Sequence, residues 1–224
     1  MIPETIKLRR SKEFRKVVKP AEAVRKDAVS VVGLDLSHTS TGICTISPVL
    51  LTGELLIEAM SVGADLREDA TLYQKWERMH RIAMEILTEI AGASVRHMGF
   101  EGAAYGRPQG MYFLGNLTGV VLEAVLGDEA VSSPQLHVVA PLQGRKKLMG
   151  RGVHDKKLVQ QFLRERCDLD FPNSDVADAF VVANFLWAKV NGPGHFGLRQ
   201  YDLDGLANAL GIKPKKGKRE NGRD

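Results

Sequence analysis

The chain has 224 residues, with 31 Lys and Arg against 27 Asp and Glu, which gives a formal net charge of +4. A hydrophobic fraction of 44% and a charged fraction of 26% are ordinary for a globular protein and exclude a wholly disordered chain. No apolar run reaches the length of a membrane-spanning helix. The only cysteines, Cys44 and Cys167, are too few for a disulfide scaffold or a multi-cysteine zinc site.

The basic residues gather in three segments. Residues 1–30 hold nine Lys or Arg against four acids, residues 141–166 hold eight against two, and residues 211–224 hold six against two. The remainder of the chain is acidic, and basic patches on an acidic body favour a polyanionic partner. For the two tails, an equal alternative is that they only keep the chain soluble.

The charge pattern and the apolar runs predict three parts. We expect a basic N-terminal arm over residues 1–28, mobile or with a short helix, a folded domain over 29–192, and a C-terminal extension with a basic tail over 193–224. The N-terminus lacks an apolar signal core, so we expect a reducing, cytoplasm-like compartment.

Short apolar runs rich in β-branched residues predict five strands, over residues 29–34, 43–46, 55–60, 97–101 and 136–140. Tight turns join the first three, which favours an antiparallel meander. Helical periodicity predicts helices over 72–90, with Gly92 as C-cap, and over 111–126, 156–166 and 174–190. The last begins at the start signal Pro172-Asn173-Ser174. This order predicts an α/β domain with one central, mixed five-stranded sheet flanked by helices.

Four carboxylates occupy unusual positions. Asp35 and Glu101 each end an apolar strand and precede a turn or a glycine-rich loop, where α/β proteins often place sites. Asp175 and Asp178 lie three residues apart, on one face at the start of an apolar helix. Asp35 could instead start a turn, and Asp175 could complement the helix dipole. Neither explanation suits Asp178, because a charge inside a buried-looking run is costly without a partner.

Four carboxylates at one end of a sheet repel one another unless cations lie between them. Mg²⁺ and Mn²⁺ prefer oxygen ligands of this kind. Two such ions about 3.5–4 Å apart can activate a water molecule and stabilise the leaving oxygen in phosphodiester cleavage. Together with the basic segments, the four acids therefore indicate a nuclease that uses two Mg²⁺ ions, with Mn²⁺ as a substitute.

Three short motifs contain these acids: Gly33-Leu34-Asp35 with a turn that closes in Thr41-Gly42, then Phe100-Glu101, then Asp175-Val176-Ala177-Asp178-Ala179. In this order and spacing they resemble the motifs of the RuvC family of Holliday junction resolvases, which have an RNase H-like fold. The resemblance covers residues 30–190. Leu36 and Ser37 replace the Pro-Gly that often follows the first acid, so the match suggests a divergent member.

The resemblance implies a homodimer that binds a four-way DNA junction and nicks opposing strands with Mg²⁺ or Mn²⁺. It implies that Asp35, Glu101, Asp175 and Asp178 bind the metal and that Lys156 assists catalysis. The residues implied in DNA binding are Arg145, Lys146, Lys147, Arg151, Lys156, Lys157 and Tyr105. Tyr105 would stack on a junction base. Because Ala103 and Ala104 precede it, Tyr105 is offset from the place of the aromatic residue that follows the catalytic Glu in the family. Residues 111–126 would line the dimer interface, although core packing explains their pattern equally well.

We therefore expect a resolvase in the cytoplasm, associated with the nucleoid or, if the chain is viral, in the host cytoplasm. Another RNase H-like nuclease, acting on flaps, other branched DNA or RNA-containing substrates, is the nearest alternative. A junction-binding module without cleavage and an actin-like phosphotransferase stay open. His38, His97, His137 and His154 could approach the site, but lone histidines are more often structural.

Overall fold

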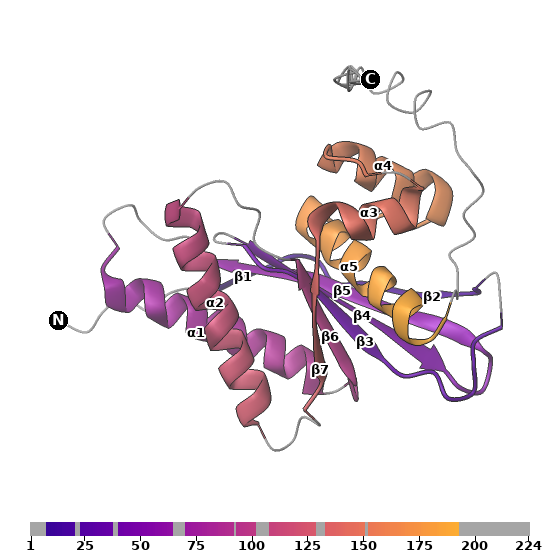
Figure 1. Ribbon diagram of the computed structural model, residues 1–224, viewed down its shortest axis with the longest axis horizontal. Helices are drawn as coiled ribbons and strands as arrows, with labels where there is room; N and C mark the ends of the chain where they lie inside the picture. Colours follow the sequence, from indigo (N-terminus) through magenta and orange to yellow (C-terminus); the bar gives the residue numbers. More distant parts are fainter. Residues whose placement is uncertain are drawn as a thin grey trace, which may run out of the picture.

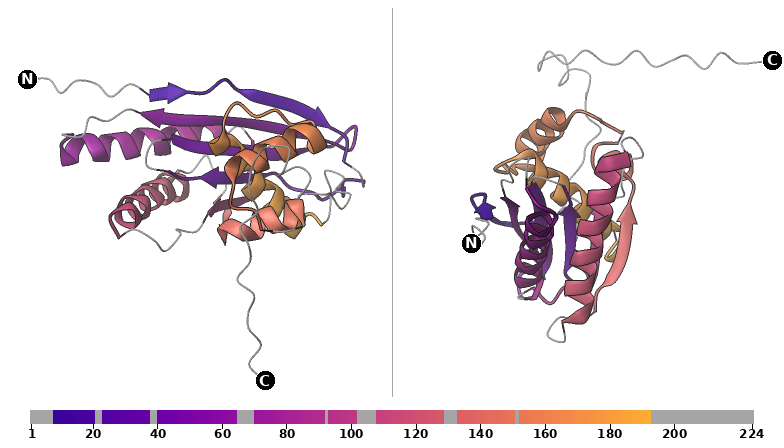
Figure 2. Two further views of the ribbon diagram at one scale, coloured as in Figure 1. Left: turned by 90° about the horizontal axis from the view of Figure 1, so that it is seen from above. Right: turned by 90° about the vertical axis from the view of Figure 1, so that its left-hand side faces the viewer.

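The computed structural model describes residues 8–20, 23–37, 40–64, 70–91, 93–101, 108–128, 133–150 and 152–192. They form one sheet with helices on both faces (Figures 1 and 2). The strands are β1 (Leu8–Arg10), β2 (Phe14–Val18), β3 (Val31–Asp35), β4 (Ser40–Val49), β5 (Glu54–Ala64), β6 (His97–Glu101) and β7 (Gln135–Val139). The helices are α1 (Leu72–Ala91), α2 (Pro108–Gly127), α3 (Pro141–Met149), α4 (Lys156–Cys167) and α5 (Ser174–Val190).

The strand order of the sheet is β1-β5-β4-β3-β6-β7, and β2 also pairs with β5. Strands β3, β4 and β5 form the antiparallel meander that the turns predict. Strands β6 and β7 run parallel to β3, so the carboxyl ends of β3 and β6 meet at one edge. The mixed sheet is confirmed, but it has seven strands rather than five.

The two additional strands come from the N-terminal segment, for which we expected a mobile arm or a short helix. That expectation is wrong for residues 8–18. Arg10 pairs with Val62 and Phe14 with Ala59, so three residues of the outer strand face two of β5, which is the geometry of a β-bulge. Phe14 packs 4.5 Å from Phe171 between ring centroids, which fixes the segment to the domain.

Several basic side chains of this segment are paired with acids of the body. The ion pairs are Arg10–Glu85, Arg15–Glu58 and Lys16–Asp168. These contacts link the outer strand to α1, to β5 and to the end of α4. Part of the basic charge of the arm therefore holds the arm to its own domain.

Helix α3 is the one helix of the described chain that the sequence pattern did not predict, because its basic sequence has weak apolar periodicity. It begins with Pro141, a residue suited to the first helical turn, and ends at Gly150, whose φ of 79° is left-handed. The other four helices lie where the periodicity places them, within three residues at each end. Gly92, the expected C-cap of α1, lies outside the described residues.

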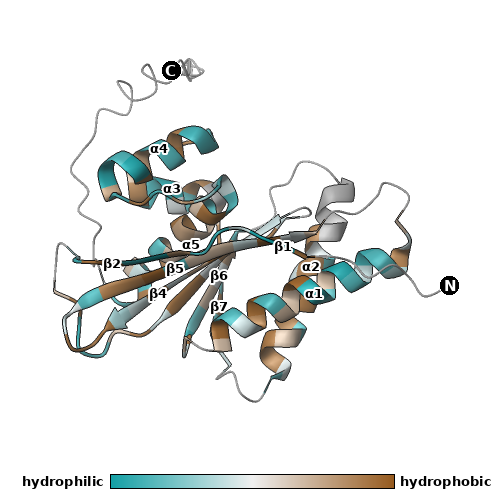
Figure 3. Cartoon of the chain, turned by 180° about the vertical axis from the view of Figure 1, so that it is seen from behind, coloured by the Kyte–Doolittle hydropathy of each residue, from teal (hydrophilic) through white to brown (hydrophobic). Residues whose placement is uncertain are grey.

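Two apolar clusters lie on opposite faces of the sheet, one under α1 and α2 and the other under α4 and α5. Figure 3 shows apolar residues along the central strands and polar ones on the outside of α4. None of the helices in the described ranges is both long and apolar enough to cross a membrane.

Helix α5 lies very close to the sheet because two strand residues opposite it are glycines. A Cβ on Gly33 would lie 2.3 Å from the carbonyl oxygen of Ala179, and a Cβ on Gly42 would lie 2.0 Å from that of Asp175. Trp187, further along α5, is buried in the apolar cluster on this face of the sheet, with 1% of its surface exposed. Because glycine has no side chain, Gly33 and Gly42 let the first turn of α5 approach the edge of the sheet where β3 ends.

Candidate active site

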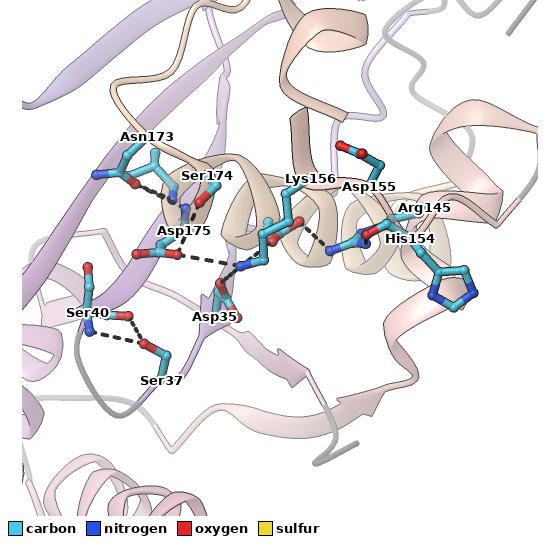
Figure 4. A network of polar contacts seen from close by, with 12 residues as sticks. Asp35, Ser37, Ser40, Arg145, His154, Asp155, Lys156, Asn173, Ser174 and Asp175 are labelled. Atoms are coloured by element: carbon cyan, nitrogen blue, oxygen red, sulfur yellow. Dashed lines mark hydrogen bonds and ion pairs between the residues drawn. The ribbon is translucent and has the colours of Figure 1, made fainter. Parts of the chain in front are cut away.

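The four predicted carboxylates come from three elements that meet at this edge. Asp35 is the last residue of β3 and Glu101 the last of β6, and the two strands are parallel neighbours. Asp175 and Asp178 lie on the first turns of α5, directly above the ends of the strands. Asp35 and Asp175 both point toward the end of the Lys156 side chain in Figure 4.

The ammonium group of Lys156 lies among three of the carboxylates. Its Nζ is 2.9 Å from Asp178 Oδ2, and 3.6 Å from both Asp35 Oδ2 and Asp175 Oδ1. Asp155 caps α4 by accepting hydrogen bonds from the backbone N–H groups of Lys157 and Leu158, which places Lys156 at the first helical position. Burial alone would lower the pKa of Lys156, but its hydrogen bond to Asp178 and the nearby negative charges raise it above its usual range.

Arg145 supports Asp178 from the other side. Its Nη2 donates to Asp178 Oδ1 at 2.8 Å, and its Nη1 donates to the carbonyl oxygens of Val153 and His154 at 2.9 and 3.2 Å. Only 7% of Arg145 and 3% of Asp178 is exposed. Asp178, the carboxylate that sequence analysis found hardest to explain without a partner, thus pairs with two cations. We expected Arg145 to contact DNA, but the structure commits its guanidinium to Asp178 and the backbone.

Negative charge remains in excess around Asp35. Burial, and the charges of Asp178, Glu101 and Asp175, raise the pKa of Asp35 to about 7 against the opposing effect of Lys156. Burial and the charge of Asp178 likewise raise the pKa of Glu101, although Arg145 and Lys156 lower it. Asp35 Oδ2 is buried without a hydrogen-bond partner among the residues that the structure describes. A further cation would offset the excess negative charge and would give Asp35 Oδ2 a partner.

The donor set fits a hard divalent cation, because four carboxylates offer oxygen ligands with a net surplus of negative charge. The side chains are not already arranged as ligands: in the described ranges, no group of three or more His, Cys, Asp or Glu converges on a metal position. The position of Lys156 among the carboxylates accounts for this, since its ammonium takes the space between them.

The other predicted residues fall into three groups. Lys146 and Lys147 on α3 and Lys157 on α4 are exposed. Tyr105, Arg151 and His38 lie outside the described residues. The remaining histidines do not enter the site: His97 and His137 contact each other at 3.1 Å, His97 being at the opposite end of β6, and the ring of His154 points away (Figure 4).

Sequence analysis missed Asn173 as a residue of the site. Its side-chain Oδ1 accepts hydrogen bonds from the backbone N–H groups of Asp175 and Val176 at 3.1 and 3.0 Å, which caps α5. Its Nδ2 donates to Ser61 Oγ on β5 at 2.8 Å. The start signal Pro172-Asn173-Ser174 marked the beginning of the helix, but no pattern connects Asn173 with residue 61.

Comparisons with known proteins bear on the fold. No protein-family model and no curated protein matches this sequence. Among solved structures, the chain resembles RuvC of Thermus thermophilus, with 21% identity over 72% of this chain and 95% of that one and a TM-score of 0.52. It also resembles T. thermophilus RuvC in complex with a Holliday junction substrate, with 22% identity, coverage of 72% and 93%, and a TM-score of 0.54.

The chain has the fold of RuvC. This result confirms the predicted α/β fold class and, at the level of the fold, the resemblance to RuvC. A third match is a fowlpox virus resolvase in complex with Holliday junction DNA, at 11% identity over 72% of this chain and 98% of that one. Its TM-score of 0.38 is too low to carry an argument.

Proposed function

We propose that this chain is a metal-dependent endodeoxyribonuclease that resolves four-way DNA junctions by paired strand nicks. The observation that carries the proposal is the meeting of Asp35, Asp175 and Asp178 around Lys156 at the carboxyl end of β3, with Glu101 on the parallel neighbour. The RuvC fold supports it, because one of the two RuvC structures is described as a complex with a Holliday junction substrate.

In this proposal, Asp35, Glu101, Asp175 and Asp178 hold two Mg²⁺ or Mn²⁺ ions. Such ions, when bound, supply an activated water and stabilise the leaving oxygen of the cleaved phosphodiester. Arg145 orients Asp178 through the 2.8 Å hydrogen bond. The ammonium of Lys156 balances the carboxylates before the metal binds, and its long side chain then lets it turn toward the scissile phosphate and stabilise the developing charge.

The exposed basic side chains beside the site are the proposed contacts to the DNA backbone. Lys146 and Lys147 on α3 and Lys157 on α4 are free of ion pairs within the described structure, and they lie on the same helices as Arg145 and Lys156. The assignment of Arg151 and Tyr105 to DNA binding stays a prediction. A homodimer with α2 in its interface is part of the proposal, because paired nicks need two sites.

The deciding experiment is a cleavage assay in Mg²⁺ on a mobile four-way junction, beside linear duplex, a flap and an RNA–DNA hybrid. We expect paired symmetric nicks on the junction alone. Asp35→Asn should abolish cleavage because Asp35 is a proposed metal ligand, while junction binding in Ca²⁺ is retained. Asp170→Asn, which changes an exposed carboxylate just beyond the C-terminal end of α4, is the matched control.

Each other outcome has a defined meaning. Cleavage of the flap or the hybrid instead of the junction would keep the metal site and assign the chain to another class of RNase H-like nuclease. Tight junction binding without cleavage in either Mg²⁺ or Mn²⁺ would favour a recognition module. A normal cleavage rate for Asp35→Asn would contradict the site.

A further inference from the structure

The first turn of α5 is connected to the edge of the sheet by a chain of side-chain hydrogen bonds. Asn173 caps the helix and also reaches Ser61 on β5, with 2.8 Å between Nδ2 and Oγ. Ser61 in turn exchanges two bonds with Ser11 of the N-terminal segment: Ser61 N–H donates to Ser11 Oγ at 2.8 Å, and Ser11 N–H donates to the Ser61 carbonyl at 2.9 Å.

The place of Ser61 in the sheet makes this chain relevant to the site. Ser61 is the β5 residue that pairs with Gly42 of β4, and Gly42 pairs with Asp35 of β3. The carbonyl of Asp175 lies directly over Gly42, where a Cβ would approach it to 2.0 Å. Ser61, Gly42 and Asp35 therefore form a row across the three strands. The bond from Asn173 to Ser61 restrains movement of the first turn of α5 along this row, and such movement would change the distance of Asp175 and Asp178 from Asp35.

Ser11 occupies the β-bulge between β1 and β2. A regular ladder would offer a backbone carbonyl to the Ser61 N–H group, whereas here the hydroxyl of Ser11 accepts that bond. Bulges of this kind redirect side chains and often occur near active sites. The bulge thus connects the N-terminal segment to the same first turn of α5.

We infer that Asn173 and Ser61 are positioning residues for the carboxylates of α5, and that Ser11 holds Ser61 in place. The inference rests on the proposed function, since it assigns these residues to the divalent-cation site of the nuclease. Loss of the bond between Asn173 and Ser61 leaves the turn bearing Asp175 free to move relative to Asp35. Removal of groups that orient metal ligands typically weakens metal affinity by about 10- to 100-fold.

Two single variants separate this bond from the helix cap. Ser61→Ala removes the bond and leaves the cap of Asn173 intact. Asn173→Ser keeps a capping hydroxyl but is too short to reach Ser61. Ser11→Ala tests the outer support, and Ser47→Ala, a half-buried serine near the other end of β4, is the matched control.

The first readout is Mn²⁺ binding to the protein alone, measured by electron paramagnetic resonance, with thermal unfolding recorded for every variant. We expect Ser61→Ala and Asn173→Ser each to raise the Kd for Mn²⁺ by about tenfold. The double variant should be no weaker than either single one, because both remove the same bond. Ser11→Ala should have a smaller effect, and Ser47→Ala none.

The second readout is the Mg²⁺ concentration for half-maximal junction cleavage, which should rise in parallel. Additive effects in the double variant, or unchanged Mn²⁺ affinity in both single variants, would overturn the inference even if the unmodified chain cuts junctions. An unmodified chain that binds Mn²⁺ but cuts no junction would overturn the proposed function, and the Mn²⁺ affinities would still decide the inference. No Mn²⁺ binding by the unmodified chain would overturn both.

Discussion

The four carboxylates of the site differ in how many cations lie beside them. Four carboxylates share two buried or half-buried cations, and the structure distributes these unequally. Asp178 binds both Lys156 and Arg145, whereas within the described ranges Asp35 pairs with Lys156 alone, at 3.6 Å. Because Asp35 is also buried, with 7% of its surface exposed, it gains from binding a proton or a metal ion.

The stability of the protein should depend on pH through Asp35. Its pKa is raised to about 7 in the folded chain, mainly by burial, from the usual value of about 4 for an exposed aspartate. Because the folded chain holds this proton to higher pH than the unfolded chain, the contribution to stability is present below pH 4 and lost as the pH rises through about 7. Asp35→Asn should therefore stabilise the protein at pH 8 more than at pH 5.

Urea unfolding at both pH values, without divalent ions, measures this difference. The exposed carboxylate variant Asp170→Asn sets the baseline. A stability difference between Asp35→Asn and the unmodified chain that is equal at the two pH values would show that Asp35 is not protonated by burial.

Arg145 should contribute to stability more than any exposed lysine of α3. Removing one partner of a buried ion pair leaves an uncompensated charge and costs about 3–5 kcal/mol. Arg145→Ala should approach that cost, because Asp178 would be left with Lys156 alone and the carbonyls of Val153 and His154 would lose their donor. Its exposed neighbour offers the control: Lys146→Ala should change the free energy of unfolding by about 0.5 kcal/mol or less. Equal effects in chemical denaturation would contradict the burial of Arg145.

Among the elements, the docking of α5 on the sheet determines whether a site exists at all. Asp175 and Asp178 reach Asp35 only because Gly33 and Gly42 leave room for the helix backbone. The N-cap at Asn173 and the bonds of Asn191 to the backbone of Val29, at 3.0 and 2.9 Å, hold the two ends of the helix. Geometry at the site therefore depends on contacts along the whole helix.

Gly42→Ala should disturb the site by displacing the start of α5. The new Cβ would lie 2.0 Å from the Asp175 carbonyl oxygen, so the helix must shift, and overpacking of this kind costs about 1–3 kcal/mol. Gly127→Ala, at the end of α2 and outside the segment proposed for the dimer interface, meets no atom within 4 Å and should change the free energy of unfolding by about 0.5 kcal/mol or less. Urea unfolding of both variants, with Mn²⁺ affinity, checks the prediction. A Gly42→Ala protein as stable as the unmodified chain would contradict the close approach.

The elements differ in how far sequence analysis could predict them. Strands β3 and β6 are apolar runs that end in an acid, and helix α5 is an apolar run that begins with two acids. The structure forms all three at the predicted places. The outer strands β1 and β2 are half-exposed and contain Arg and Lys among their apolar residues. Their sequence therefore resembles that of a basic tail. Only pairing with β5, a partner distant in sequence, gives them a fixed structure.

The same distinction applies within the site. The order of Asp35, Glu101, Asp175 and Asp178 predicted that they meet, because strand ends and helix starts have fixed geometry. Arg145 is buried against Asp178, which lies 33 positions later in the sequence. Asn173 bonds to Ser61, which lies 112 positions earlier. No local pattern carries such information, and both residues resemble ordinary polar residues in sequence.

For the molecule as a whole, the arrangement of charge matters more than the net charge of +4. The N-terminal segment uses Arg10, Arg15 and Lys16 in ion pairs with its own domain. The exposed lysines of α3 and α4, in contrast, lie on the helices beside the carboxylates. We therefore expect DNA to be held mainly at α3 and α4.

Salt dependence of junction binding tests this distribution. Each phosphate contact adds about one unit to the slope of log affinity against log salt concentration. Replacing both Lys146 and Lys147 with Ala should lower the slope by about two. Arg96→Ala, an exposed cation just before β6 at the end opposite Glu101, should leave it unchanged. Fluorescence anisotropy in Ca²⁺ between 50 and 200 mM salt, concentrations over which such slopes are measurable, provides the values. An unchanged slope for the double variant would place the DNA elsewhere.

The burial of Trp187 has a practical consequence. The chain has two tryptophans, and the other, Trp76 on α1, has 49% of its surface exposed against 1% for Trp187. Replacing Trp76 with Phe leaves Trp187, in the helix that carries Asp175 and Asp178, as the only tryptophan. Its emission would shift to longer wavelength when water reaches the indole ring. The protein therefore contains its own optical reporter for the detachment of α5, and no dye needs to be attached near the site.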